Sequence, residues 1–131
     1  MSADATISRM ERLAQSLLAA TEEGRVEWSA ADDTQTTFST ARSAGSVVIE
    51  SHDRDGAEPY ILTVFDSSGR RVETLESSWD QGDTVLGIRQ AARWNDLLRN
   101  LYEAARRRAL NIDTVLDALI NDAAQRGDLH R

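Results

Sequence analysis

The chain has 131 residues, with 22 acidic and 15 basic side chains, a formal net charge of -7 and no cysteine. This length suits one domain with an ordinary hydrophobic core, and the lack of cysteine excludes thiolate catalysis, cysteine-based zinc sites and disulfides. The negative charge disfavours nucleic acid and anionic membranes as partners. All basic residues are arginine, whose codons are rich in G and C, which is typical of a G+C-rich bacterial genome.

The sequence carries no signal for a membrane or for export. Residues 1–6 lack the basic residues of a signal peptide. No apolar run approaches the roughly 18 residues that a membrane-spanning helix requires. We therefore expect a cytoplasmic protein.

Apolar residues at helical spacing open the chain. They are Ile7, Met10, Leu13, Ala14, Leu17 and Leu18. The pattern predicts a helix over about Asp4 to Glu23 that covers a sheet, with Gly24 as its C-terminal stop. Ser8 and Glu11 have the spacing of a capping box.

The period of the apolar residues then changes to two, which is typical of strands. The five expected strands are Arg25 to Ser29, Gln35 to Ala41, Ser46 to His52, Glu58 to Phe65 and Arg70 to Ser77. Every connection between them is too short for a parallel crossover, so we expect an antiparallel meander.

The segment from Tyr60 to Leu75 is the clearest structural signal, because it contains an apolar strand, a turn and a half-polar return strand. In the apolar strand, Leu62 and Val64 share one face, and Ile61 and Phe65 share the other. An interior strand with a second, partly covered face has this composition. The cover could come from the C-terminal helices of the same chain or from a second protomer.

Helical spacing returns near the C-terminus and predicts a long helix over about Val85 to Arg108 and a last helix from Ile112 to about Gln125. With no internal repeat or linker, residues 1–131 are expected to form one α+β domain: an N-terminal helix, a five-stranded antiparallel meander and two C-terminal helices. The expected core contains Val26, Trp28, Val47, Ile49, Leu62, Val64, Trp94, Leu98 and Leu101.

Three segments, Leu17 to Trp28, Tyr60 to Gly69 and Leu97 to Ala109, resemble a group of small uncharacterised bacterial proteins. In that group a helix ends in a Thr and Gly turn, leads to a strand with Trp, and is followed by a meander and a Leu-Tyr, Ala-Arg helix. The resemblance implies this element order and carries no activity. In size and low pI the chain is also similar to the small acidic chaperones of bacterial secretion systems, whose strands are usually interrupted by a helix.

Two motifs suggest a catalytic site or a metal site, but a structural interpretation suits both better. The segment Ser51-His52-Asp53 contains the three residue types of a hydrolase triad. Neighbours on a strand point to opposite faces, however, so Ser51 and His52 cannot converge. Residues 53–56 resemble part of a calcium loop without its third early oxygen ligand or its last Glu, and Asp and Gly suit a turn. With only two histidines, the chain is expected to bind no metal or other cofactor.

The arginines of the long helix are a possible binding site for phosphate or an acidic partner. Arg106, Arg107 and Arg108 lie near its end, with Arg99 one or two turns earlier. Arginine is also favoured at a helix C-terminus by the helix dipole, and Glu103 can pair with Arg99 or Arg107 at four-residue spacing. This structural interpretation is preferred, and binding stays open.

The three tryptophans are expected in different places: Trp28 and Trp94 in the core, and Trp79, among polar residues, on the surface. An exposed tryptophan can anchor a partner. The candidate partner-binding residues are therefore Trp79, Arg99, Arg106, Arg107, Ile112, Leu116 and Leu119.

No catalytic constellation is visible, so the leading functional hypothesis is a non-enzymatic protein-interaction or adaptor module. We expect a homodimer, because the last helix carries an apolar stripe that one small sheet does not need: Ile112, Val115, Leu116, Leu119 and Ile120. The alternative is a small-molecule or nucleotide-binding domain, with a pocket between sheet and long helix lined by Trp94, Tyr102 and an arginine such as Arg99.

Overall fold

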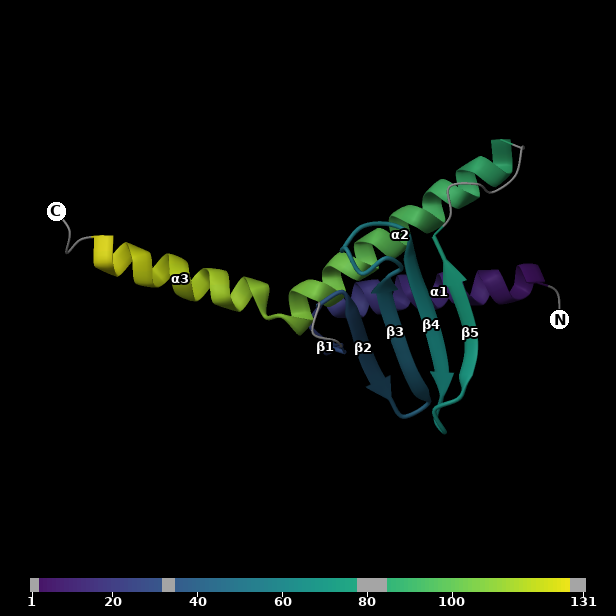
Figure 1. The fold of residues 1–131 in the computed structure, drawn as a ribbon, viewed down its shortest axis with the longest axis horizontal. Helices are drawn as coiled ribbons and strands as arrows, with labels where there is room; N and C mark the ends of the chain where they lie inside the picture. The colour runs from purple at the N-terminus through teal and green to yellow at the C-terminus, as the bar shows by residue number, and fades with distance from the viewer. Residues whose placement is uncertain (1–2, 32–34, 78–84, 128–131) are drawn as a thin grey trace.

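The computed structural model describes residues 3–31, 35–77 and 85–127, and the side chains at 8–31, 35–77 and 92–125. Its elements in chain order are α1 (Ala3–Glu22), β1 (Ser29–Ala30), β2 (Thr37–Arg42), β3 (Gly45–Ser51), β4 (Tyr60–Asp66), β5 (Arg71–Glu76), α2 (Val85–Ala109) and α3 (Ile112–Gly127) (Figure 1). The predicted α+β fold, with a helix, five strands and two helices, is confirmed.

The five strands form one antiparallel sheet in the order β1-β2-β3-β4-β5, as a meander requires. In the centre of the sheet Ile49 pairs with Leu62, and Val47 with Val64. A register shift next to Val64 interrupts the pairing of β4 with β5. All connections are hairpins, so neighbouring strands stay neighbours in the sheet.

The first strand was predicted at Arg25 to Ser29, which is wrong: β1 contains only Ser29 and Ala30. The residues before it are tied to α1 instead of to a neighbouring strand, because the backbone N–H of Arg25 donates to the carbonyl of Ala20 at 2.8 Å. Val26 and Trp28 are nevertheless buried on one side, as the alternation predicts.

The turn that ends α1 is built as expected, and the helix agrees with the predicted range of about Asp4 to Glu23. Gly24 has φ +78°, and its N–H donates to the carbonyl of Thr21 at 3.1 Å, which is the left-handed stop that favours glycine. Ser8 and Glu11 lie inside α1, which begins at Ala3. Their capping-box spacing therefore does not mark the N-terminus of the helix.

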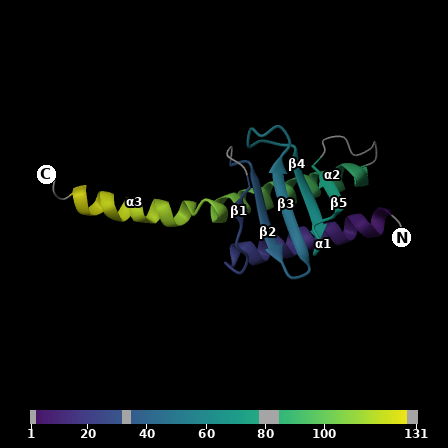
Figure 2. The ribbon, with the colours of Figure 1, turned by 60° about the horizontal axis from the view of Figure 1, so that its bottom comes forward.

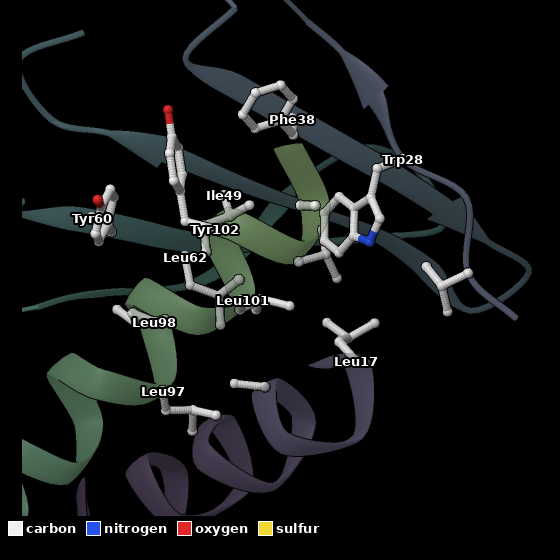
Figure 3. Close-up of a cluster of buried hydrophobic side chains, with 14 of the residues drawn as sticks. Leu17, Trp28, Phe38, Ile49, Tyr60, Leu62, Leu97, Leu98, Leu101 and Tyr102 are labelled. Carbon is white, nitrogen blue, oxygen red and sulfur yellow. The ribbon is translucent and has the colours of Figure 1, made fainter. Parts of the chain in front are cut away.

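Both α1 and α2 lie on the same face of the sheet (Figures 1 and 2). α2 packs against the strands, and α1 packs chiefly against α2, so the expectation that α1 itself covers the sheet holds only in part. In the core the Tyr102 ring lies 5.5 Å from that of Phe38 and 4.4 Å from that of Tyr60, measured between centroids (Figure 3).

The predicted core agrees with the structure at eight of nine positions. Val26, Trp28, Val47, Ile49, Leu62, Trp94, Leu98 and Leu101 are buried. The ninth, Val64, is partly buried and packs against this cluster. The alternation of β3 and β4 thus places the apolar face with Ile49 and Leu62 under the helices.

α3 takes no part in this layered body. It continues from the end of α2 past the β1 edge of the sheet and extends away from the other elements (Figures 1 and 2). The C-terminal helices of the same chain therefore do not cover the second face of the sheet. α2 lies on the same face as α1, and α3 lies on neither face.

Candidate functional site

The junction between α2 and α3 is a short, defined break in an otherwise continuous helical segment. Asn111 adopts the left-handed conformation with φ +52°, and its carbonyl accepts the N–H of Val115 at 3.0 Å. Arg107 and Asp113 form an ion pair of 2.8 Å across the break. From this junction α3 continues away from the sheet (Figure 1).

The apolar side of α3 is the strongest candidate for a functional surface, because the described side chains from 113 to 125 are all exposed. The exposed fractions are 50% for Val115, 48% for Leu116, 58% for Leu119 and 62% for Ile120. Together with the half-buried Ile112, these side chains form the α3 stripe, at the spacing of one helix face. Exposed contiguous apolar side chains of this kind mark interaction sites in folded proteins.

The sheet carries a second uncovered surface, on the side opposite α1 and α2. Val48, Ile61 and Phe65 point to this side by strand alternation, and all three are partly exposed. Thr63, between them, is 8% exposed. We call these four residues the open face. Its β4 residues Ile61 and Phe65 are the second apolar side of this strand that the sequence predicts.

The arginines predicted as candidates each face a carboxylate. The Arg99 Nε lies 2.8 Å from Glu58 Oε1, and this hydrogen bond holds the pKa of Arg99 above its ordinary value. Arg106 lies 3.9 Å from Glu103, and Arg107 pairs with Asp113. The predicted pairing of Glu103 with Arg99 or Arg107 is therefore wrong, because Glu103 meets Arg106 at three-residue spacing.

The tryptophans that the structure describes serve the core. The Trp28 Nε1 donates to the Thr21 hydroxyl at 2.9 Å, and the Trp94 Nε1 donates to the Glu76 carbonyl at 3.2 Å. Both assignments to the core are confirmed by burial. Trp79 lies outside the described residues, so its predicted exposure stays a prediction.

A cavity of about 560 Å³ lies where α1 ends and α2 meets α3. Thr21, Asn100 and Arg108 are among its lining residues. The Arg108 Nε is buried and has no hydrogen-bond partner among the described residues, while its guanidinium lies against Gly24, where a side chain would collide with it. Arg108 belongs to the arginine cluster predicted as a possible phosphate site, but not to the candidate partner-binding residues, although its three-residue spacing from Ala105 indicates the inner side of α2.

The three residues proposed for a pocket between sheet and helix lie in separate environments. Trp94 is in the core, Tyr102 is buried in the aromatic cluster, and Arg99 is paired at the surface. Tyr102 does line a second cavity, of about 450 Å³, together with Asp55 and Arg106. The proposed trio is thus not brought together.

The Ser51 to Gly56 region is a structural turn. The Ser51 hydroxyl is 2.8 Å from the Ala57 carbonyl and 3.1 Å from Asp55 Oδ1, whereas the His52 ring contacts Asp53. Hydrogen bonds from the Ala57 N–H and the Ser51 hydroxyl lower the pKa of Asp55. Ser51 and His52 do not converge, as strand alternation predicts, and no group of three metal-binding side chains occurs among the described residues.

Comparison of the chain with known protein families, curated proteins and solved structures found no match. In the parts of the chain that the structure describes, no helix is long and apolar enough to cross a membrane. The assignment of a function therefore depends on the α3 stripe, the open face of the sheet and the cavities described above.

Proposed function

We propose that the protein is a non-enzymatic protein-interaction module that self-associates through α3. The observation that carries the proposal is the α3 stripe, in which four large apolar side chains are about half exposed on a helix that packs on no sheet. Each such side chain gains about 1.5 to 3 kcal/mol when it is fully buried. Binding to another protein surface is the direct way to obtain this free energy.

The length of α3 supports the same conclusion. The helix has 16 residues, and isolated helices of this length are marginally stable in water, because most helical stability in proteins comes from packing of an apolar face. Only the first turn of α3 has the support of the body, through Ile112 and the Arg107–Asp113 pair. A partner that covers the stripe would stabilise the remaining turns.

Light scattering tests self-association directly. One chain has a mass of 14.5 kDa, and the expected mass at micromolar concentration is twice this value. Leu116→Asp places a charge in the stripe and should weaken self-association at least about tenfold, since the loss of one buried leucine already corresponds to this factor. Asn121→Asp adds the same charge on the opposite side of α3 and is the matched control.

A mass near that of one chain for the unchanged protein would contradict the proposal. Equal effects of Leu116→Asp and Asn121→Asp would also contradict it, because the stripe would then have no special role.

A second candidate function, binding of a small anionic molecule, is supported by the buried Arg108 Nε in the cavity at the end of α1. The cavity also contains Glu103 and Asp113, whose carboxylates oppose an anion. Thermal unfolding in the presence of inorganic phosphate or acetate tests it, with Arg108→Gln as the variant that removes the effect. An unchanged unfolding temperature would exclude these anions.

A further inference from the structure

The cavity of about 560 Å³ lies where the end of α1 passes α2, close to the junction with α3 (Figure 1). Ligand pockets for small molecules have volumes of about 300 to 1,000 Å³, so the cavity has a suitable size. Its lining combines charged side chains with the half-buried Leu18 and Ala104. A ligand in this cavity would therefore meet both charged groups and apolar surface.

The charged side chains of the lining do not all find partners within the chain. They are three carboxylates, of Glu22, Glu103 and Asp113, and two guanidinium groups, of Arg107 and Arg108. Arg107 pairs with Asp113 at 2.8 Å, and Glu103 has an arginine of its own on α2. The side chains of Glu22 and Arg108 form no ion pair or hydrogen bond with any other described residue.

Arg108 holds a hydrogen-bond donor that the described part of the chain does not satisfy. Its Nε is buried and has no hydrogen-bond partner among the described residues. Its guanidinium lies so close to Gly24 that a Cβ at this position would collide with it. A buried N–H of a charged group without an acceptor is costly, and a ligand oxygen that accepts it would remove this cost.

Glu22 is an acidic side chain at an unfavourable end of a helix. It is the last residue of α1, whose last turn contains no basic residue, and a helix C-terminus favours cations over anions. The neighbouring Glu23 pairs with Arg25 at 2.9 Å, whereas Glu22 has no ion pair among the described residues. A cationic group of a ligand would be stabilised here by the carboxylate and by the helix dipole.

We propose that the cavity binds a small zwitterion, an α-amino acid with an aliphatic side chain; this inference deepens the second candidate function and rests on it. The ligand carboxylate accepts a hydrogen bond from Arg108, its ammonium group lies at Glu22, and its side chain contacts Leu18 and Ala104. A zwitterion adds no net charge to a lining that has one carboxylate more than guanidinium groups. A simple anion would add to this excess and is therefore the weaker ligand.

A purely structural role is the alternative for Arg108, because a cation near the end of α1 also interacts favourably with the helix dipole. In that case the cavity would not distinguish ligands by their charged groups. Binding measurements with matched ligands therefore separate the two roles.

Three ligands with the same carbon skeleton test the proposal. Leucine carries both charged groups, 4-methylpentanoate lacks the ammonium group, and 3-methylbutylamine lacks the carboxylate. In calorimetric titration of the full chain at neutral pH, leucine should bind at least about tenfold more tightly than either of the other two, because a hydrogen bond to a charged group corresponds to at least this factor. Equal affinities of leucine and 4-methylpentanoate would overturn the zwitterion in favour of a plain anion site.

Two variants test the assigned groups one at a time. Arg108→Gln should lower the affinity for leucine at least about tenfold without lowering that for 3-methylbutylamine, which has no carboxylate. Glu22→Gln should lower the affinity for leucine without lowering that for 4-methylpentanoate. Glu23→Gln removes the neighbouring exposed carboxylate, which pairs with Arg25, and is the matched control. Equal losses in Glu22→Gln and Glu23→Gln would overturn the assignment of the ammonium group to Glu22.

Circular dichroism first shows that each variant is folded. Arg108→Lys keeps the charge but lacks the Nε donor, and it replaces Arg108→Gln if that variant unfolds; the same loss of leucine affinity is expected.

The outcomes separate this inference from the proposed functions. Binding of phosphate, acetate or 4-methylpentanoate with no preference for leucine would overturn the zwitterion and keep the anion site. No binding of any of these ligands to the unchanged protein at millimolar concentration would overturn both, and Arg108 would then have a structural role. The mass from light scattering tests self-association through α3 independently of the cavity.

Discussion

α2 and α3 carry apolar residues at the same helical spacing, but they lie in opposite environments. Leu98 and Leu101 of α2 are fully buried against the sheet, whereas Leu119 and Ile120 of α3 are 58% and 62% exposed. An amphipathic pattern therefore predicts that one face of a helix packs against another apolar surface. It does not predict whether that surface belongs to the same chain or to another molecule. In this chain the difference between the two helices locates the proposed interaction surface.

The largest expected effect is on the free energy of unfolding, which should respond very differently to substitutions in α2 and in α3. Leu98→Ala should lower the free energy of unfolding by about 2 to 5 kcal/mol, because it leaves a cavity in a filled core. Leu119→Ala in the single-chain state should change it by no more than about 0.5 kcal/mol, since an exposed side chain loses little. Urea unfolding of both variants in the Leu116→Asp background measures the difference.

Equal losses for Leu98→Ala and Leu119→Ala in that background would mean that α3 packs on the body of its own chain. The contrast between the helices would then be wrong.

A second prediction concerns the polar contact that ties α1 to the start of the sheet. Thr21 accepts the Trp28 Nε1–H at 2.9 Å, and its hydroxyl donates to the Leu17 carbonyl at 2.6 Å. Thr21→Val keeps the shape but leaves the buried indole N–H without an acceptor, which should cost about 1 to 3 kcal/mol of unfolding free energy. Thr21→Ser, which keeps the hydroxyl, is the control, and an equal loss in both variants would argue against this hydrogen bond.

A smaller effect is expected from Asp55 and depends on pH. Its pKa is lowered in the folded state, so its contribution to stability is present above the ordinary value of about 4 and is lost as the pH falls through the folded pKa. Asp55→Ala should therefore reduce the loss of stability between pH 7 and pH 3, measured by urea unfolding. Asp117→Ala removes an exposed carboxylate of α3 and should leave that loss unchanged.

An unaltered pH dependence in Asp55→Ala would show that the turn gains nothing from the charged form of this side chain.

The smallest effect is expected from metal ions. Asp55 Oδ1 already accepts the Ala57 N–H at 2.9 Å and lies 3.1 Å from the Ser51 hydroxyl. This carboxylate oxygen is therefore engaged in hydrogen bonds within the turn. Calorimetric titration with calcium or zinc should show no site of micromolar affinity or tighter. A tight calcium response that disappears in Asp55→Ala would overturn the assignment of residues 53–56 as a structural turn.

The element order could be predicted from the sequence because the apolar period changes from helical to alternating and back. Alternation also places Ile49 and Leu62 in the core and Ile61 and Phe65 on the other face, as the structure shows. The start of β1 could not be predicted, since the Arg25 N–H donates to α1 and this bond depends on the tertiary position of the turn.

The candidate site was predictable in part. The stripe from Ile112 to Ile120 follows from spacing alone, whereas its exposure depends on the direction that α3 takes after Asn111. The side of the sheet that the helices leave bare, and the position of Arg108 against Gly24, depend on packing between distant segments. No local sequence pattern reports such contacts.

Hydrogen exchange of the α3 amides, measured as a function of protein concentration, tests the central contrast most directly. Protection of α3 is expected to rise with concentration in step with the doubled mass, because a helix of this length needs a cover for its apolar face. Protection of α2 should stay the same, and Leu116→Asp should abolish the rise in α3. Protection of α3 that is high and independent of concentration in a single chain would contradict the account.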